Sequence, residues 1–264
     1  MKSNQVIMDF DTALYNKSEV LKNITRLISM HKAGKLGGEI MPEDARPIII
    51  DLHSSDNYHF LTLPMTLNYQ RNSYTLWQSA AKAFLDKECN AIFHPNIVAE
   101  MSVDELRTLL LRHKVALQPN KHVDTWQRVS KSIVKLFDSD IRNLFIEADF
   151  DISKIKMIVQ EVNKKDFPYL SGHKIFNYWL HVMEVYTPTK FKNRQEISVA
   201  PDTHIIQGTL RLGLIKGNID EIAQNRTVVA DAWTELLNKT DIVPIDVHTP
   251  LWLWSKRGFP PIEA

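Results

Sequence analysis

Hydrophobic residues recur at intervals of three and four positions through most of the chain, which is the spacing of one buried face of an α-helix. The first such run begins at Ser18 and ends before Gly34. Further runs cover residues 74–85, 102–111, 124–137, 151–162, 175–186, 202–213 and 226–237. Only "IIIDL" at residues 48–52 has the short, continuous apolar pattern of a buried strand. The pattern therefore predicts a mostly α protein.

The run at residues 175–186, "IFNYWLHVMEVY", is apolar nearly all round, and a helix of that kind belongs in the middle of a structure. No repeat, low-complexity segment or linker divides the 264 residues, a length that suits two modest lobes around a shared core. We expect two interlocked helical lobes. Residues 1–55 are predicted to form an N-terminal helical extension, and residues 56–264 the core.

Charge and cysteine content narrow the classes of function. Lysine and arginine number 32 and the acidic residues 31, a net charge of +1 that argues against a large basic module. Cys89 is the only cysteine, which excludes an internal disulfide and any four-thiolate metal site. No Ser-His-Asp signature, phosphate-cradling glycine loop or H-E-x-x-H spacing is present, so no metal or cofactor is expected.

Targeting signals are also missing from the sequence pattern. No apolar stretch approaches the roughly 18–20 residues that a membrane span requires. The first residues, "MKSNQVIMDFD", lack the apolar core and small cleavage-site residues of a signal peptide. We expect a cytoplasmic monomer without a membrane partner.

Asp202 stands directly before the amphipathic run that ends near Gly213. Aspartate is a favoured N-cap, because its side-chain oxygen accepts a free N–H group at the start of a helix. Capping alone explains this residue, but an acid held at a helix end can also serve chemistry. His204 does not share a helix face with Asp202 and is interpreted as structural or phosphate-facing.

Lys174 begins the most hydrophobic helix of the chain, directly after "LSGH". The helix dipole favours cations at the opposite end, and apolar surroundings favour the neutral amine over the ammonium. A neutral lysine amine is a nucleophile. The alternative is a lysine whose ammonium reaches solvent from the helix end.

The second half of the chain contains a characteristic order of elements. It reads helix, tight glycine-containing turn, lysine, central helix, aspartate and amphipathic helix. This order resembles the helix-hairpin-helix DNA glycosylase superfamily. The resemblance depends on "FPYLSGHKI" (167–175) and "PDTHIIQGTLRLGLI" (201–215). Residues 226–254 are similar to the C-terminal end of the archaeal 8-oxoguanine DNA glycosylase branch, and residues 67–84 to its first core helices. The likeness covers roughly residues 60–257.

The resemblance implies a hairpin at about residues 155–186 and a catalytic aspartate helix at 202–213. It implies a DNA glycosylase with lyase activity that removes an oxidised purine, such as 8-oxoguanine, from damaged double-stranded DNA in base excision repair. Lys174 would attack the sugar, and Asp202 would stabilise its positive charge. The resemblance also implies contacts from Gln70, His248 and Trp252 to the everted base or to the gap that it leaves in the duplex. It implies contacts to phosphate from Gly172 and His173.

Three positions depart from the family pattern. Leu170 replaces the first hairpin glycine, which puts one backbone contact to phosphate in question. The single Cys89 rules out the iron–sulfur cluster of some relatives. His248 stands where the archaeal branch has aspartate, so the choice of base can differ.

Two other functions stay open. Residues 96–137 resemble the middle of the queuosine salvage family, whose enzymes release a modified base from a nucleotide, and the near-zero net charge suits that small substrate. The third possibility is a non-catalytic module that only binds nucleic acid. We place the DNA glycosylase first, because "DTHIIQGTLRLGLI" fits it better.

Overall fold

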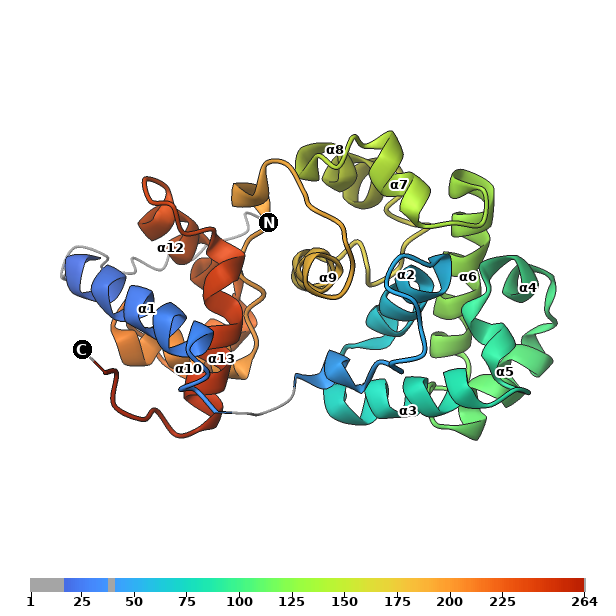
Figure 1. Ribbon diagram of the computed structural model, residues 1–264, viewed down its shortest axis with the longest axis horizontal. Coiled ribbons are helices and arrows are strands. Elements are labelled where there is room, and N and C mark those ends of the chain that lie inside the picture. Colours follow the sequence, from blue (N-terminus) through green and yellow to red (C-terminus); the bar gives the residue numbers. More distant parts are fainter. Residues whose placement is uncertain (1–16, 38–40, 264) are drawn as a thin grey trace, which may run out of the picture. The chain divides into compact units, whose positions relative to one another are not determined.

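The computed structural model describes residues 17–37 and 41–263, which divide into two compact units (Figure 1). The central unit contains residues 41–197, and the C-terminal unit joins residues 17–37 to residues 198–263. The fold is 64% helical, and the described residues contain no strand beyond one isolated bridge between Asp151 and Lys192. The prediction of a mostly α protein is confirmed. The boundary predicted after residue 55 falls inside the central unit.

The central unit is built from eight α-helices within its described residues. They are α2 (Ser55–Thr62), α3 (Ser73–Leu85), α4 (Pro95–Glu100), α5 (Val103–Arg112), α6 (Lys121–Phe137), α7 (Arg142–Glu147), α8 (Ile152–Lys156) and α9 (His173–Tyr186). Shorter helical turns are η2 (Pro42–Ala45), η3 (Pro64–Leu67), η4 (Asn90–Phe93), the π-helix η5 (Met157–Val162) and η6 (Arg194–Glu196). Rings of Phe60, Phe93 and Trp126 pack in succession, with centroids 5.5 and 5.7 Å apart, and form part of the core.

Helix α9 places its apolar side chains in this core, as its composition predicts. Phe176, Trp179 and Met183 are fully or almost fully buried. The indole N–H of Trp179 donates to the hydroxyl of Thr62 on α2 at 3.1 Å. The hydrogen bond and the surrounding apolar contacts fix the helix that begins with His173 and Lys174.

The short strand predicted at residues 48–52 is wrong. Residues 48 and 49 lie in a turn instead, where Ile48 is 95% exposed and Ile49 80% exposed, while Ile50 alone is buried. Pro47 precedes them and offers no N–H for a sheet ladder. An apolar run that short cannot be distinguished from a turn by its periodicity alone.

The C-terminal unit consists of helices from both ends of the chain. They are α1 (Lys17–Lys32), α10 (Thr203–Leu212), α11 (Ile219–Gln224), α12 (Thr227–Leu237), the turn η7 (Pro244–Val247) and α13 (His248–Lys256). Helices α10 and α13 approach closely at Gly208, where a Cβ would lie 3.2 Å from the side chain of Leu251. Gly213 ends α10 in the left-handed conformation, with φ of 77°, as the sequence predicts.

Among the described helices, none combines the length and the apolar character needed to cross a bilayer.

Candidate functional site

The carboxylate of Asp202 is fixed by two N–H donors within the C-terminal unit. Its Oδ1 accepts from the backbone N–H of Ile205 at 2.9 Å, so the predicted N-cap of α10 is confirmed. Its Oδ2 accepts from the indole N–H of Trp252 at 3.1 Å. Each carboxylate oxygen has a further lone pair, and the residue is only partly buried. The cap therefore orients the acid without using all of its acceptor capacity.

Trp252 supplies this second hydrogen bond from α13, a contact that its place in the sequence does not reveal. The ring of His204 meets the indole edge-on, with centroids 5.2 Å apart, and the ammonium of Lys256 lies 4.7 Å from the indole centroid. Trp252 itself is 9% exposed. The indole thus orients Asp202 as well as offering an aromatic surface.

A chain of polar side chains holds His204 beside this pair. The hydroxyl of Ser255 donates to Oε1 of Gln207 at 3.0 Å and lies 3.2 Å from Nδ1 of His204. Because the single hydroxyl proton goes to Gln207, Nδ1 of His204 is the donor in the second bond. His204 therefore ties α10 to α13.

His248 begins α13 in the same unit and is 4% exposed. It therefore shares this unit with Asp202 and Trp252. Burial leaves little of its side chain at the surface of the protein, so a base contact through His248 would need an opening beside it.

The turn before α9 is held by backbone hydrogen bonds and by two side-chain hydrogen bonds. The N–H of Gly172 donates to the carbonyl of Tyr169 at 2.9 Å, and the hydroxyl of Ser171 donates to the carbonyl of Lys164 at 3.1 Å. The amide of Gln160 reaches the carbonyl of Ser171 at 2.9 Å. A Cβ on Gly172 would lie 3.0 Å from the Tyr169 carbonyl, so glycine suits this position.

Leu170 does not need the conformational freedom of the glycine that the family pattern has there. Its side chain is fully buried, and the positive φ of this turn, 62°, belongs to Tyr169 instead. Gly172, His173 and Lys174 are exposed at the start of α9. The start of the helix is therefore accessible to solvent.

The turn that carries Gln70 is joined to the turn before α9 by stacked aromatic rings. Tyr69 and Tyr169 lie parallel, with centroids 3.9 Å apart and an interplanar angle of 8°. The ammonium of Lys121 lies 5.2 and 5.1 Å from the two ring centroids. Gln70 is exposed with a φ of 49°. The structure thus brings two predicted nucleic-acid segments together in one unit, through tyrosines that the sequence analysis missed.

A buried histidine lies beside this stack. His122 is 2% exposed, and its Nδ1 accepts the N–H of Leu117 at 3.1 Å while its Nε2 has no hydrogen bond within the described residues. Burial, reinforced by the charges of Arg71 and Lys121, lowers the pKa of His122 to about 4. The imidazole is therefore neutral near pH 7.

A buried carboxyl group, that of Glu43, forms a hydrogen bond with the helix that carries Lys174. Glu43 is 1% exposed, and its Oε2 accepts from the hydroxyl of Tyr178 at 3.1 Å. Tyr178 stands one helical turn after Lys174, on the same face of α9. Burial raises the pKa of Glu43 to about 7. The neighbouring Asp44 accepts from the hydroxyl of Tyr186 at 2.8 Å and secures the other end of α9.

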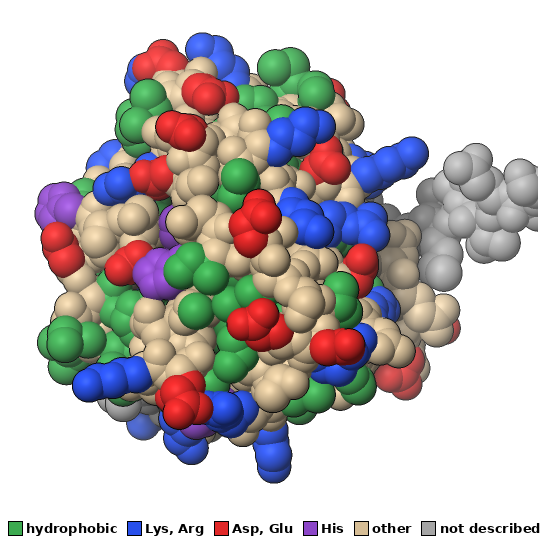
Figure 2. Space-filling model, turned by 90° about the vertical axis from the view of Figure 1, so that its right-hand side faces the viewer, with side chains coloured by type: hydrophobic (Ala, Val, Ile, Leu, Met, Phe, Trp, Pro, Cys, Tyr) green, Lys and Arg blue, Asp and Glu red, His purple; other side chains and the backbone are tan. Residues whose placement is uncertain are grey.

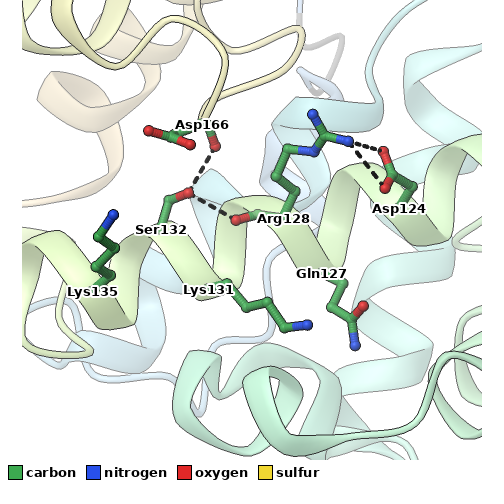
Figure 3. Close-up of a pocket in the computed structure, with 7 residues that line it drawn as sticks. All are labelled: Asp124, Gln127, Arg128, Lys131, Ser132, Lys135 and Asp166. Atoms are coloured by element: carbon green, nitrogen blue, oxygen red, sulfur yellow. Dashed lines mark hydrogen bonds and ion pairs between the residues drawn. The ribbon is translucent and has the colours of Figure 1, made fainter.

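A groove of about 290 Å³ runs along α6 where the loop that carries Asp166 crosses it (Figure 3). The hydroxyl of Ser132 donates to the carbonyl of Asp166 at 3.0 Å and joins the two segments. Arg128 pairs with Asp124 at 3.0 Å. Lys131 and Lys135 are exposed and form no ion pair with the described part of the chain. The groove is lined by Asp124, Gln127, Arg128, Lys131, Ser132, Lys135 and Asp166.

The two predicted catalytic residues belong to different units. Lys174 lies in the central unit, with Gly172, His173 and Gln70, whereas Asp202 lies in the C-terminal unit.

No model of a known protein family matches the chain, and no curated protein matches it.

Proposed function

We propose that the protein is a DNA glycosylase with lyase activity, in which α8, η5 and α9 form the helix-hairpin-helix motif and Lys174 and Asp202 are the catalytic residues. The observation that carries this proposal is the carboxylate of Asp202, held at the start of α10 by the N–H groups of Ile205 and Trp252. A carboxyl group fixed in this manner needs no reorganisation when positive charge develops nearby.

The proposed reaction begins when the damaged base leaves C1′ of an everted nucleotide. Asp202 stabilises the positive charge that develops on the sugar, and the neutral amine of Lys174 forms a bond to C1′. Asp202 accepts a proton from the attacking amine. The C1′–O4′ bond of this adduct then breaks, a proton goes to O4′, and a Schiff base forms between C1′ and Lys174. Loss of a proton from C2′ permits β-elimination of the 3′ phosphate, and hydrolysis by water then releases Lys174.

The groove on α6 supports DNA as the substrate. Arg128, Lys131 and Lys135 occupy successive turns of one helix face, over about 10 Å at 1.5 Å per residue. With one phosphate per about 3.4 Å along each DNA strand, that length matches about three phosphates. The exposed Lys164 and Lys165 adjoin them in the loop that Ser132 contacts.

The basic character is local to this groove. Figure 2 shows basic and acidic side chains interspersed on the face of the molecule that it draws. A small nucleotide does not need a row of cations of this length. The alternative, release of a base from a queuosine nucleotide, is supported instead by the near-zero net charge and by the likeness of residues 96–137.

Base release distinguishes these functions. The full-length protein is incubated with a duplex that contains 8-oxoguanine, and separately with queuosine 5′-monophosphate, and free base is measured by chromatography. We expect release from the duplex, reduced by about 100-fold to 1,000-fold in Asp202→Asn. Asparagine is also a good N-cap, so this variant removes the charge but preserves the start of α10.

Asp231→Asn is the matched control, because Asp231 is an exposed acid on α12 of the same unit. This control is expected to retain full activity. Release from the nucleotide alone would transfer the assignment to the queuosine type. Salt-sensitive DNA binding without base release, unchanged in Asp202→Asn, would identify a binding module.

A further inference from the structure

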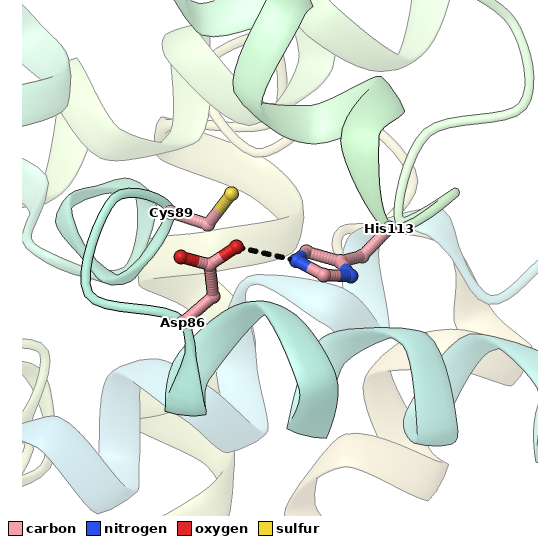
Figure 4. A group of neighbouring side chains, drawn as sticks. All are labelled: Asp86, Cys89 and His113. Atoms are coloured by element: carbon pink, nitrogen blue, oxygen red, sulfur yellow. Dashed lines mark hydrogen bonds and ion pairs between the residues drawn. The ribbon is translucent and has the colours of Figure 1, made fainter.

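Three side chains of different chemistry converge at one end of α3 and α5 in the central unit. Asp86 is the first residue after α3, Cys89 follows in the same turn, and His113 is the residue directly after α5 (Figure 4). One oxygen, one sulfur and one nitrogen atom from these residues all lie within 4.8 Å of one another. Oδ2 of Asp86 and Nε2 of His113 are 2.7 Å apart.

The local backbone positions the first two of these groups. The N–H of Cys89 donates to the carbonyl of Asp86 at 3.0 Å, which closes a turn around Lys87 and Glu88. The N–H of Glu88 donates to Oδ1 of Asp86 at 2.9 Å and leaves Oδ2 directed toward His113. Two residues separate Asp86 from Cys89, which is the spacing of paired ligands in many structural zinc sites.

We propose that Asp86, Cys89 and His113 bind one zinc ion, which joins the turn after α3 to the end of α5. A thiolate, an imidazole and a carboxylate are the three ligand types that zinc takes in proteins. The thiolate and carboxylate together balance the charge of Zn²⁺.

The observed geometry is close to what this ion requires. Ligand atoms around a tetrahedral zinc ion lie about 3.5 Å apart, given bonds of about 2.0–2.3 Å. The three atoms, at most 4.8 Å apart, reach that spacing by small side-chain rotations. Binding releases the thiol proton of Cys89 and replaces the hydrogen bond between Asp86 and His113. The remaining imidazole proton then resides on Nδ1.

Accessibility also fits a zinc site. Cys89 is fully buried, whereas the side chains of Asp86 and His113 are 25% and 26% exposed. The ion therefore has a protein side and a solvent side, and water completes its fourth position. The guanidinium of Arg112, 3.9 Å from Oδ2 of Asp86, is itself ion-paired with Glu88.

Cobalt titration tests this proposal on the intact chain. Co²⁺ occupies zinc sites and gives a thiolate-to-metal charge-transfer band in the near ultraviolet when a cysteine is a ligand. Because Cys89 is the only cysteine, any such band in the wild-type protein reports on this site. We expect the band to saturate at one equivalent of Co²⁺ and to disappear when Zn²⁺ is added.

His113→Gln is expected to weaken Co²⁺ binding by at least about 100-fold, since loss of an outer-shell partner alone costs 10-fold to 100-fold. His53→Gln, an exposed histidine of the same unit outside the triad, is the matched control and should bind as the wild type does. Absence of the band in folded wild-type protein would overturn the proposal without any variant. Unchanged Co²⁺ affinity in His113→Gln would also overturn it. Neither result depends on glycosylase activity.

Discussion

The buried carboxyl of Glu43 makes the stability of the central unit depend on pH. Burial raises the pKa of Glu43 from 4.5 to about 7. The folded state therefore keeps this proton to a higher pH than the unfolded chain does, and it loses stability as the pH rises from 4.5 through 7. The difference between the two pKa values corresponds to about 3 kcal/mol in the free energy of unfolding.

Glu43→Gln is expected to remove this loss. The amide keeps the size of the side chain, and its oxygen can accept the hydroxyl of Tyr178 as the carboxyl does. Relative to wild type, the variant should gain about 3 kcal/mol between about pH 4 and about pH 8. The comparison across pH cancels any constant cost of the substitution. Urea denaturation, followed by hydrogen exchange of peptides from residues 41–197, measures the unfolding of this unit alone.

Asp44→Asn is the control for this experiment. It removes the next carboxylate in the same helical turn, but Asp44 is exposed, so no comparable gain at high pH is expected. If Glu43→Gln differs from wild type by the same amount at both pH values, the argument from burial is refuted.

Three further predictions follow from hydrogen bonds and charges in the two units. Trp252→Phe removes the N–H that holds Asp202. Because a hydrogen bond to a charged group contributes about 1.5–3 kcal/mol, the single-turnover rate of base release should fall by about 10-fold to 100-fold. An unchanged rate would show that Trp252 does not contribute to base release. The double variant Lys131→Gln, Lys135→Gln should bind DNA with a smaller salt dependence. Fluorescence anisotropy should show the slope of log affinity against log salt concentration reduced in magnitude by about 2. An unaltered slope would exclude the groove as a phosphate contact. Burial lowers the pKa of His59 from 6.5 to about 4, so His59→Gln should gain about 3 kcal/mol relative to wild type as the pH falls through this range; a difference between the two proteins that does not change with pH in urea denaturation would contradict this.

Local features of the fold were predictable from the sequence because neighbouring residues determine them. Asp202 caps α10 and Gly213 ends it, as the amphipathic run between them indicates. The prediction of a strand at residues 48–52 was wrong because the local sequence does not determine burial there. Three adjacent isoleucines do not reveal that two of them face solvent.

Contacts between distant segments could not be predicted in the same way. Trp252 donates to Asp202 across a separation of 50 positions, and only the packing of α10 on α13 brings them together. The stack of Tyr69 on Tyr169 depends likewise on how two turns meet. The Asp-x-x-Cys turn is visible in the sequence, but its third proposed ligand, His113, depends on where α5 ends.

The central claim is that the amine of Lys174 attacks a sugar whose departing base is assisted by Asp202. It is tested most directly by trapping the covalent intermediate with borohydride on an 8-oxoguanine duplex and locating the modified lysine by peptide mass spectrometry. We predict one adduct, on Lys174, which is absent from Lys174→Gln and present in Lys156→Gln, an exposed lysine at the end of α8. An adduct on any other lysine, or no adduct with any oxidised or abasic duplex, would contradict the claim.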